Sequence, residues 1–219
     1  MALLLAAFAY PALPREATAN SNVAPSPCLN VIAGLDSSTW TTGRGPWLGG
    51  AIGQTFLAED TLITRLTVWR PPNNLSVVGV HLIITAVDTT LSPPRPDTYQ
   101  ILLDGPTVAV YASDPPGQLI RVSFLIDPPL ALPRRGRYAF FLQPENCTSG
   151  EPWRIVARTD NPYPFGIYWV TPRVFSECYL RPVSGGGDND DLLFQIEYCI
   201  PSETPIRTQS WGKLKVLYR

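Results

Sequence analysis

The side chains best suited to chemistry in this sequence lie in one acidic stretch near its end. The run "SGGGDNDDLLF" places Asp188, Asp190 and Asp191 directly after three consecutive glycines. Carboxylate oxygens on a flexible loop are the hard ligands that Ca²⁺ prefers. We therefore predict a structural calcium site at these three residues, with a solvated turn, in which Asp and Asn favour the required backbone angles, as the alternative.

Aromatic residues in Gly- and Pro-rich segments form the second candidate group. Trp40 and Trp47 lie in "STWTTGRGPWLGG", and Tyr163 lies in "NPYPFGIYWV". A flat ring pairs with the apolar face of a sugar, while nearby polar groups take its hydroxyls. We predict that these three residues bind a ligand, with carbohydrate as the leading candidate and core packing as the alternative role.

The sequence contains few candidate catalytic residues. His81 is the only histidine, and it lies in the middle of the strand-like run "VGVHLIITAV". Nothing around it resembles a nucleophile elbow, and a Ser-His-Asp or Cys-His system needs a positioned base. No two carboxylates are singled out by their spacing as a glycosidase pair. We predict a non-catalytic protein and keep a glycan-active hydrolase or lyase as the third hypothesis.

The four cysteines favour disulfides over a metal site or reactive thiols. They are Cys28, Cys147, Cys178 and Cys199, and no two form a Cys-x-x-Cys pair of the kind that binds zinc. An even number of cysteines after an export signal is typical of a disulfide framework. Of the three possible pairings, we favour Cys28 with Cys199 and Cys147 with Cys178.

The elements that must position these residues are strands. Short runs rich in Val, Ile, Thr and aromatic residues recur, and the 24 prolines and 16 glycines separate them. The clearest strand candidates are 51–58, 62–70, 77–87, 107–113, 119–126, 136–143, 153–159, 166–171 and 191–199. No helical crossover segments lie between them, so the sequence predicts an all-β domain of two packed antiparallel sheets.

Strict alternation within two of these runs predicts which side chains are buried. In 62–70, the predicted inward residues are Leu62, Thr64, Leu66 and Val68. In 119–126, they are Ile120, Val122, Phe124 and Ile126. Proline cannot donate to a sheet ladder, so we predict that Pro-rich segments such as "SPPRPD" and "DPPLALP" are loops or strand ends.

Both ends of the chain differ from its body. The apolar start, followed by the small-x-small triplet at 17–19, predicts a signal peptide over residues 1–19, with a buried strand or short helix as the alternative. The apolar run is too short for a transmembrane span. The body, 20–203, carries 12 arginines and 17 acidic residues, a net charge of −5 that argues against nucleic-acid binding. The tail, 204–219, has a net charge of +4 and holds the only lysines.

Specific runs in the body resemble a known type of domain. "IGQTF" with "LTVW" after it, then "GRYAFFLQ", "PYPFGIYWV" and "DLLFQIEYC", are similar to secreted bacterial jelly-roll β-sandwiches of the galactose-binding-like and discoidin-like kind. The resemblance covers roughly residues 50–199 and implies one jelly-roll β-sandwich of about eight to ten strands. It implies a binding role more than a catalytic one, since it rests on pattern and on no catalytic signature.

The tail resembles a short C-terminal motif, Trp-Gly-x-Leu-Lys-x-x-Tyr-Arg, that closes many secreted bacterial proteins. Its members here are Trp211, Gly212, Lys213, Lys215, Tyr218 and Arg219. The resemblance implies a tag that contacts sorting machinery. The residues alone leave two structures open: a helix that begins after Ser210, or a last strand "KLKVLYR" on the sandwich edge.

These observations predict a secreted or cell-surface, non-catalytic binding module, with a glycan or another cell-surface component as its partner. The alternative is a structural subunit of an extracellular protein assembly. Structural Ca²⁺ is the only cofactor that the sequence predicts.

Overall fold

The computed structural model describes residues 28–34, 42–44, 50–72, 78–110, 118–145, 154–172, 180–187 and 190–201. Several predicted features lie outside these residues: the signal peptide 1–19, the tail 204–219, and the side chains of Trp40, Trp47, Cys147, Cys178 and Asp188.

Every regular element in the described residues is a strand, which confirms the predicted all-β class. The strands are β1 (Cys28–Gly34), β2 (Thr42–Arg44), β3 (Ile52–Ala58), β4 (Leu62–Arg70), β5 (Val78–Asp88), β6 (Arg95–Val110), β7 (Ile120–Ala131), β8 (Gly136–Pro144), β9 (Ile155–Arg158), β10 (Tyr168–Val170), β11 (Gly185–Gly187), β12 (Asp191–Leu192) and β13 (Phe194–Pro201). They exceed the predicted eight to ten partly because β2, β11 and β12 are too short to leave a period-2 pattern. Among these residues no helix is long and apolar enough to cross a membrane.

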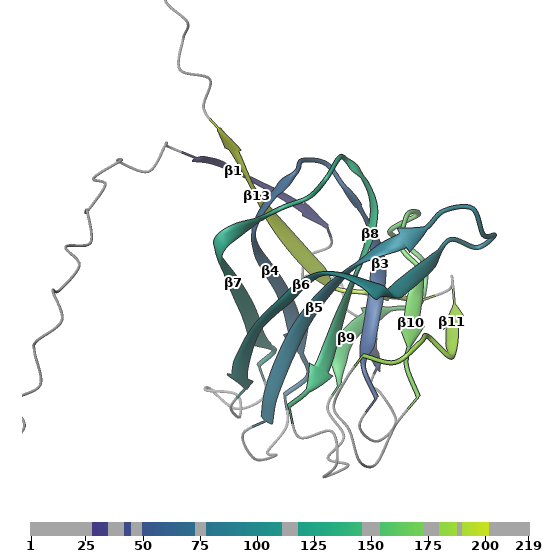
Figure 1. Ribbon diagram of the computed structural model, residues 1–219. Coiled ribbons are helices and arrows are strands. Elements are labelled where there is room, and N and C mark those ends of the chain that lie inside the picture. The colour runs from purple at the N-terminus through teal and green to yellow at the C-terminus, as the bar shows by residue number, and fades with distance from the viewer. Residues whose placement is uncertain are drawn as a thin grey trace, which may run out of the picture.

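The strands form three antiparallel sheets (Figure 1). One sheet has the order β1-β13-β4-β7, the largest has the order β11-β10-β3-β8-β5-β6, and a small one has the order β12-β9-β2. β7 closes one side of the first sheet and β6 closes one side of the second, so each is an edge strand. The jelly-roll connectivity stays a prediction.

The two larger sheets share one apolar core. Its fully buried members come from strands of both sheets and from the small sheet, and include Phe56, Leu66, Leu82, Phe124, Phe140, Ile155 and Phe194. Phe140 and Phe194 meet with ring centroids 5.2 Å apart, which joins β8 of one sheet to β13 of the other. Burial of this kind is the dominant favourable contribution to folding.

The predicted alternation is confirmed in β7. Val122, Phe124 and Ile126 are core residues, and Ile120 packs against them from a partly buried position. In β4 the prediction for the first residue was wrong, because Ile63 is fully buried in place of Leu62. The register explains the change: Arg65 pairs with Glu197 and Ile63 with Tyr198, which leaves Thr64 as an extra residue that reverses the faces.

The Pro-rich segment "SPPRPD" is a strand end as predicted, because β6 begins at Arg95. The segment "DPPLALP" lies partly inside a strand, since β7 contains Pro128 and Pro129, and Pro106 lies inside β6. Both β6 and β7 are edge strands, where a missing N–H on the open side costs no ladder hydrogen bond.

A second apolar cluster covers the other face of the six-stranded sheet. Ile83, Phe141 and Trp169 project from β5, β8 and β10, and the segment that carries Leu180 and Val183 packs over them. This sheet is therefore covered on both faces around Trp169.

Candidate functional site

The acidic stretch that we predicted to bind calcium places one carboxyl group, that of Asp191, in the protein interior. Asp191 begins β12 and is 0% exposed. Its Oδ1 accepts a hydrogen bond of 2.9 Å from Gln54 Nε2, and its Oδ2 accepts one of 2.7 Å from the backbone N–H of Tyr163. Gln54 also accepts a hydrogen bond from the backbone N–H of Leu192. Asp191 therefore links β3, β12 and the loop before β10.

Burial raises the pKa of Asp191 to about 6, because a charged carboxylate loses its hydration inside the protein. The hydrogen bonds from Tyr163 and Gln54 act in the opposite direction, since they stabilise the charged form. The charges of Asp160 and Asp190 raise the pKa further.

The calcium site itself stays a prediction. Asp188 lies outside the described residues, and Asp190 is partly buried beside Asp191. Among the residues that the structure describes, no group of three or more His, Cys, Asp or Glu side chains could hold a metal ion.

Tyr163 is held at both its ring and its hydroxyl group. The hydroxyl oxygen accepts a hydrogen bond of 3.0 Å from the backbone N–H of Leu57. Its ring meets Phe194 and Phe165 edge-on, at centroid distances of 5.3 and 5.9 Å. The core-packing alternative therefore describes this ring well. Trp40 and Trp47, its predicted companions, lie outside the described residues.

His81 forms a three-residue cluster across β5 and β6. Its Nδ1 lies 3.1 Å from Thr107 Oγ1, and its Nε2 lies 2.5 Å from Asp104 Oδ1. The residue types match a hydroxyl–imidazole–carboxylate triad. The Asp104 side chain, however, is 78% exposed, so water solvates its charge. Both ring nitrogens therefore have partners across the strand pair.

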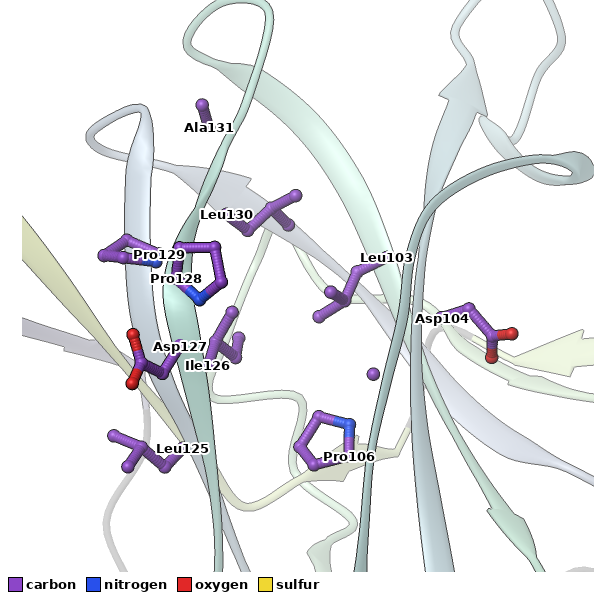
Figure 2. Close-up of a pocket in the computed structure, with 11 residues that line it drawn as sticks. Leu103, Asp104, Pro106, Leu125, Ile126, Asp127, Pro128, Pro129, Leu130 and Ala131 are labelled. Carbon is purple, nitrogen blue, oxygen red and sulfur yellow. The ribbon is translucent and has the colours of Figure 1, made fainter. Parts of the chain in front are cut away.

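The feature that the sequence did not indicate is an apolar groove between the two edge strands (Figure 2). It has a volume of about 490 Å³ and runs between residues 103–106 of β6 and 125–131 of β7. Leu103 and Pro106 face Ile126 and Leu130 across it, as Figure 2 shows. Its inner wall continues into the core, because Ile126 is a core residue and Leu103 and Leu130 pack against the core.

Two β-bulges form the walls of the groove. In β6, Thr107 pairs with His81 and Asp104 with Ile83, so two residues, Gly105 and Pro106, face one residue of β5. In β7, Leu130 pairs with Ile63 and Leu125 with Arg65, so residues 126–129 face a single residue of β4. Bulges bend an edge strand away from its regular path. The prolines of "DPPLALP", in the β7 wall, were the one sequence signal, and we interpreted that segment as a loop or strand end.

The groove is apolar inside and acidic at its sides. Asp104 and Asp127 project from the far sides of the two walls, away from the gap (Figure 2). No basic side chain lines the groove within the described residues. Leu125, beside it on β7, is 59% exposed. This lining suits a ligand with apolar side chains inside the groove and basic groups that reach the carboxylates beyond its walls.

A second pocket, of about 360 Å³, lies between the β5–β6 turn and the segment before β11. Leu91, Pro93 and Arg95 line one side, and Trp169 and Ser184 line the other. Arg95 Nη2 donates a hydrogen bond of 2.6 Å to the carbonyl of Val183. Trp169 is 7% exposed, and its indole Nε1 has no hydrogen-bond partner in the described structure.

Of the four cysteines, Cys199 is the one whose side chain the structure describes. Cys199 in β13 is 5% exposed and is disulfide-bonded. In the strand register, Cys199 pairs with Asn30 and Cys28 pairs with Pro201. The identity of the partner of Cys199 stays a prediction.

Comparison with known proteins adds no relative. No protein-family model matches the chain, and no curated protein sequence matches it either.

Proposed function

We propose that this chain is a non-catalytic binding module of the cell exterior, and that the groove between β6 and β7 holds an extended polypeptide segment. The observation that carries the proposal is the groove itself, with Leu103, Pro106, Ile126 and Leu130 inside and carboxylates at its sides. Apolar pockets with a few charged groups at their rim are typical of protein-binding surfaces.

The chemistry of the lining favours a polypeptide over a sugar. A glycan site needs convergent donors and acceptors for the hydroxyls, and the inner lining consists of leucine, isoleucine, proline, alanine and glycine. Prolines 106, 128 and 129 have no N–H to offer a ligand backbone. The ligand is therefore held by its side chains more than by an added strand ladder.

The extracellular location rests on the sequence and on one cysteine. The signal peptide 1–19 and the even cysteine count support export, and the disulfide-bonded Cys199 fits an oxidising compartment. We propose the pairing of Cys28 with Cys199, which lie on the neighbouring strands β1 and β13. Cys147 with Cys178 is then the second pair. We also propose the jelly-roll connectivity that the resemblance implies.

Binding of synthetic peptides by the full-length chain tests the proposal. On an array of 12-residue peptides, we expect those that combine aromatic or aliphatic residues with Lys or Arg to bind. Leu130→Glu places a charge inside the groove and should weaken this binding at least about tenfold, because burying an unpaired charge is costly. Glu145→Lys, at the exposed end of β8, is the control that leaves it intact. Binding to no peptide, by the full-length chain and equally by a chain that ends at Glu203, would refute the proposal.

Carbohydrate binding is the second candidate, and the pocket beside Trp169 favours it. A buried indole N–H without a partner needs an acceptor, and Arg95 adds a cation at the same pocket. Trp169→Phe removes the N–H and keeps a ring, so it should reduce a glycan-array signal, while Trp69→Phe, in a different cluster, should not. Trp47→Ala tests the predicted loop site separately.

Calcium, the extracellular assembly and the glycan-active enzyme remain proposals of lower rank. Millimolar Ca²⁺ should raise the melting temperature if Asp188, Asp190 and Asp191 bind it, and an unchanged melting temperature removes that idea. Self-association without a glycan signal would favour the structural subunit. Release of reducing sugar ends would favour the hydrolase.

A further inference from the structure

We infer that the segment held in this groove is the C-terminal segment of the same chain, residues 211–218. The inference rests on the proposed function, because it names the ligand of the groove.

Charge complementarity is the first argument. The body has a net charge of −5, and the carboxylates of Asp127 and of Asp104, which also contacts His81 Nε2, project from the far sides of the two groove walls (Figure 2). Lys213 and Lys215 are the only lysines in the protein. A long lysine side chain can lie along an apolar wall and reach a carboxylate beyond it. The most basic segment of the chain thus matches the acidic sides of the groove.

The residue pattern is the second argument. In an extended segment, Leu214, Val216 and Tyr218 project from one side, and Trp211, Lys213, Lys215 and Leu217 project from the other. The first group matches the apolar inside of the groove, and the two lysines of the second match its sides. An isolated helix of this length is only marginally stable in water. The segment therefore gives up little stability when it binds in an extended conformation.

The place where the described chain ends is the third argument. Tyr198 of β13 pairs with Ile63 of β4, and Ile63 also pairs with Leu130 of β7. Tyr198 is therefore two strand spacings, or about 10 Å, from Leu130 of the groove wall, and Pro201 lies three residues, or about 10 Å, further along β13 at the same end of the sheet. The ten residues from Pro201 to Trp211 reach about 33 Å when extended. The segment can enter the groove of its own chain.

Attachment to the same chain favours this ligand over a free peptide. A tether of this length gives an effective concentration in the millimolar range. A weak, side-chain-held interaction is then sufficient for occupancy.

Photo-crosslinking in the full-length protein tests the inference. Tyr218 is replaced by p-benzoylphenylalanine, and the crosslinked peptides are mapped by mass spectrometry. We expect crosslinks to 103–106 and 125–131. In a mixture of ¹⁵N-labelled and unlabelled protein, the two peptides of each crosslinked pair should carry the same nitrogen isotope, because both come from one molecule. Mixed-isotope crosslinks would show that a second copy supplies the segment, and crosslinks elsewhere, or none, would also overturn the inference.

A matched pair of charge reversals separates docking from chance contact. Asp127→Lys at the side of the groove should reduce the crosslink yield about three- to fivefold, and 0.5 M salt should do the same in the unmodified protein. Glu145→Lys makes the same charge change at the end of β8 and should leave the yield unchanged. Equal effects of the two variants would contradict the assignment. If the array peptides bind at the groove while Tyr218 does not crosslink there, the proposed function stands and this inference fails.

Discussion

Gln54 and Asp191 form a buried hydrogen bond of 2.9 Å although they lie 137 positions apart in the chain. Both side chains are 0% exposed. The bond connects β3 of the largest sheet with β12 of the smallest, and Tyr163 joins it through its backbone N–H. This polar contact lies among apolar residues, so each of its partners depends on the others for hydrogen bonding.

Gln54→Ala should lower the free energy of unfolding by about 2–4 kcal/mol. The substitution removes the donor to Asp191 and the acceptor for the Leu192 N–H, and each buried group left unsatisfied costs about 1–3 kcal/mol. Urea denaturation measures the change. Gln100→Ala on the exposed part of β6 is the control, with an expected change below about 0.5 kcal/mol. Similar losses in both variants would contradict a structural role for Gln54.

Stability should fall as the pH rises from about 4 to about 6, in proportion to the titration of Asp191. Its pKa is raised from 3.8 in the unfolded chain to about 6 in the folded one, so the folded state binds more protons in this window. The contribution is present below pH 4 and lost above pH 6. Its size is on the order of 1–3 kcal/mol, since one pKa unit corresponds to about 1.4 kcal/mol.

Urea denaturation at several pH values measures this dependence. Asp191→Asn has no proton to exchange and should flatten the curve between pH 4 and 6. The substitution also replaces one acceptor oxygen of Asp191 with an NH₂ group, which cannot accept a hydrogen bond from Gln54 or Tyr163. The free energy of unfolding of the variant should therefore be lower at every pH. An unchanged slope in the variant would assign the pH dependence to other groups.

The sequence predicted those parts of the fold that depend on neighbours along the chain. Alternation in 119–126 identified Val122, Phe124 and Ile126 as core residues, because a regular strand alternates its faces every residue. The same rule was wrong at Leu62, because the bulge at Thr64 depends on how β4 pairs with β13. Pairing across more than a hundred residues leaves no mark on the local pattern.

The candidate site was less predictable for the same reason. Asp191 was found as a carboxylate in a Gly-rich run, but its burial depends on Gln54, which nothing near Asp191 indicates. The groove requires two bulges on different sheets to face each other. The prolines that mark these bulges are in the sequence, and they can be interpreted correctly only when β6 and β7 are known to be edge strands.

Neighbouring residues of β7 should respond to substitution in opposite ways. Phe124 is 0% exposed and Leu125 is 59% exposed. Phe124→Ala should lower the free energy of unfolding by about 3–5 kcal/mol, because it leaves a cavity in the core. Leu125→Ser should change it by less than about 0.5 kcal/mol. Thermal and urea unfolding of both variants measure the difference, and a larger loss in Leu125→Ser would show that the strand faces are reversed.

Gly166→Ala should destabilise the contact between Gln54 and Asp191 directly. A Cβ atom at this position would lie 2.3 Å from Gln54 Nε2 and 2.4 Å from Asp191 Oδ1. Both atoms belong to fully buried side chains that bind each other, so neither can move without breaking the hydrogen bond. We expect a loss of about 2–4 kcal/mol in the free energy of unfolding.

Gly136→Ala is the matched control for this variant. A Cβ atom at Gly136 meets no other atom within 4 Å, and the substitution restricts the unfolded chain. Its stability should therefore be unchanged or higher by up to about 1 kcal/mol. The double variant of Gly166→Ala with Gln54→Ala adds a sharper test, because the shorter side chain makes room for the new methyl group. The two losses should then be less than additive, and full additivity would place the clash of Gly166→Ala somewhere other than Gln54.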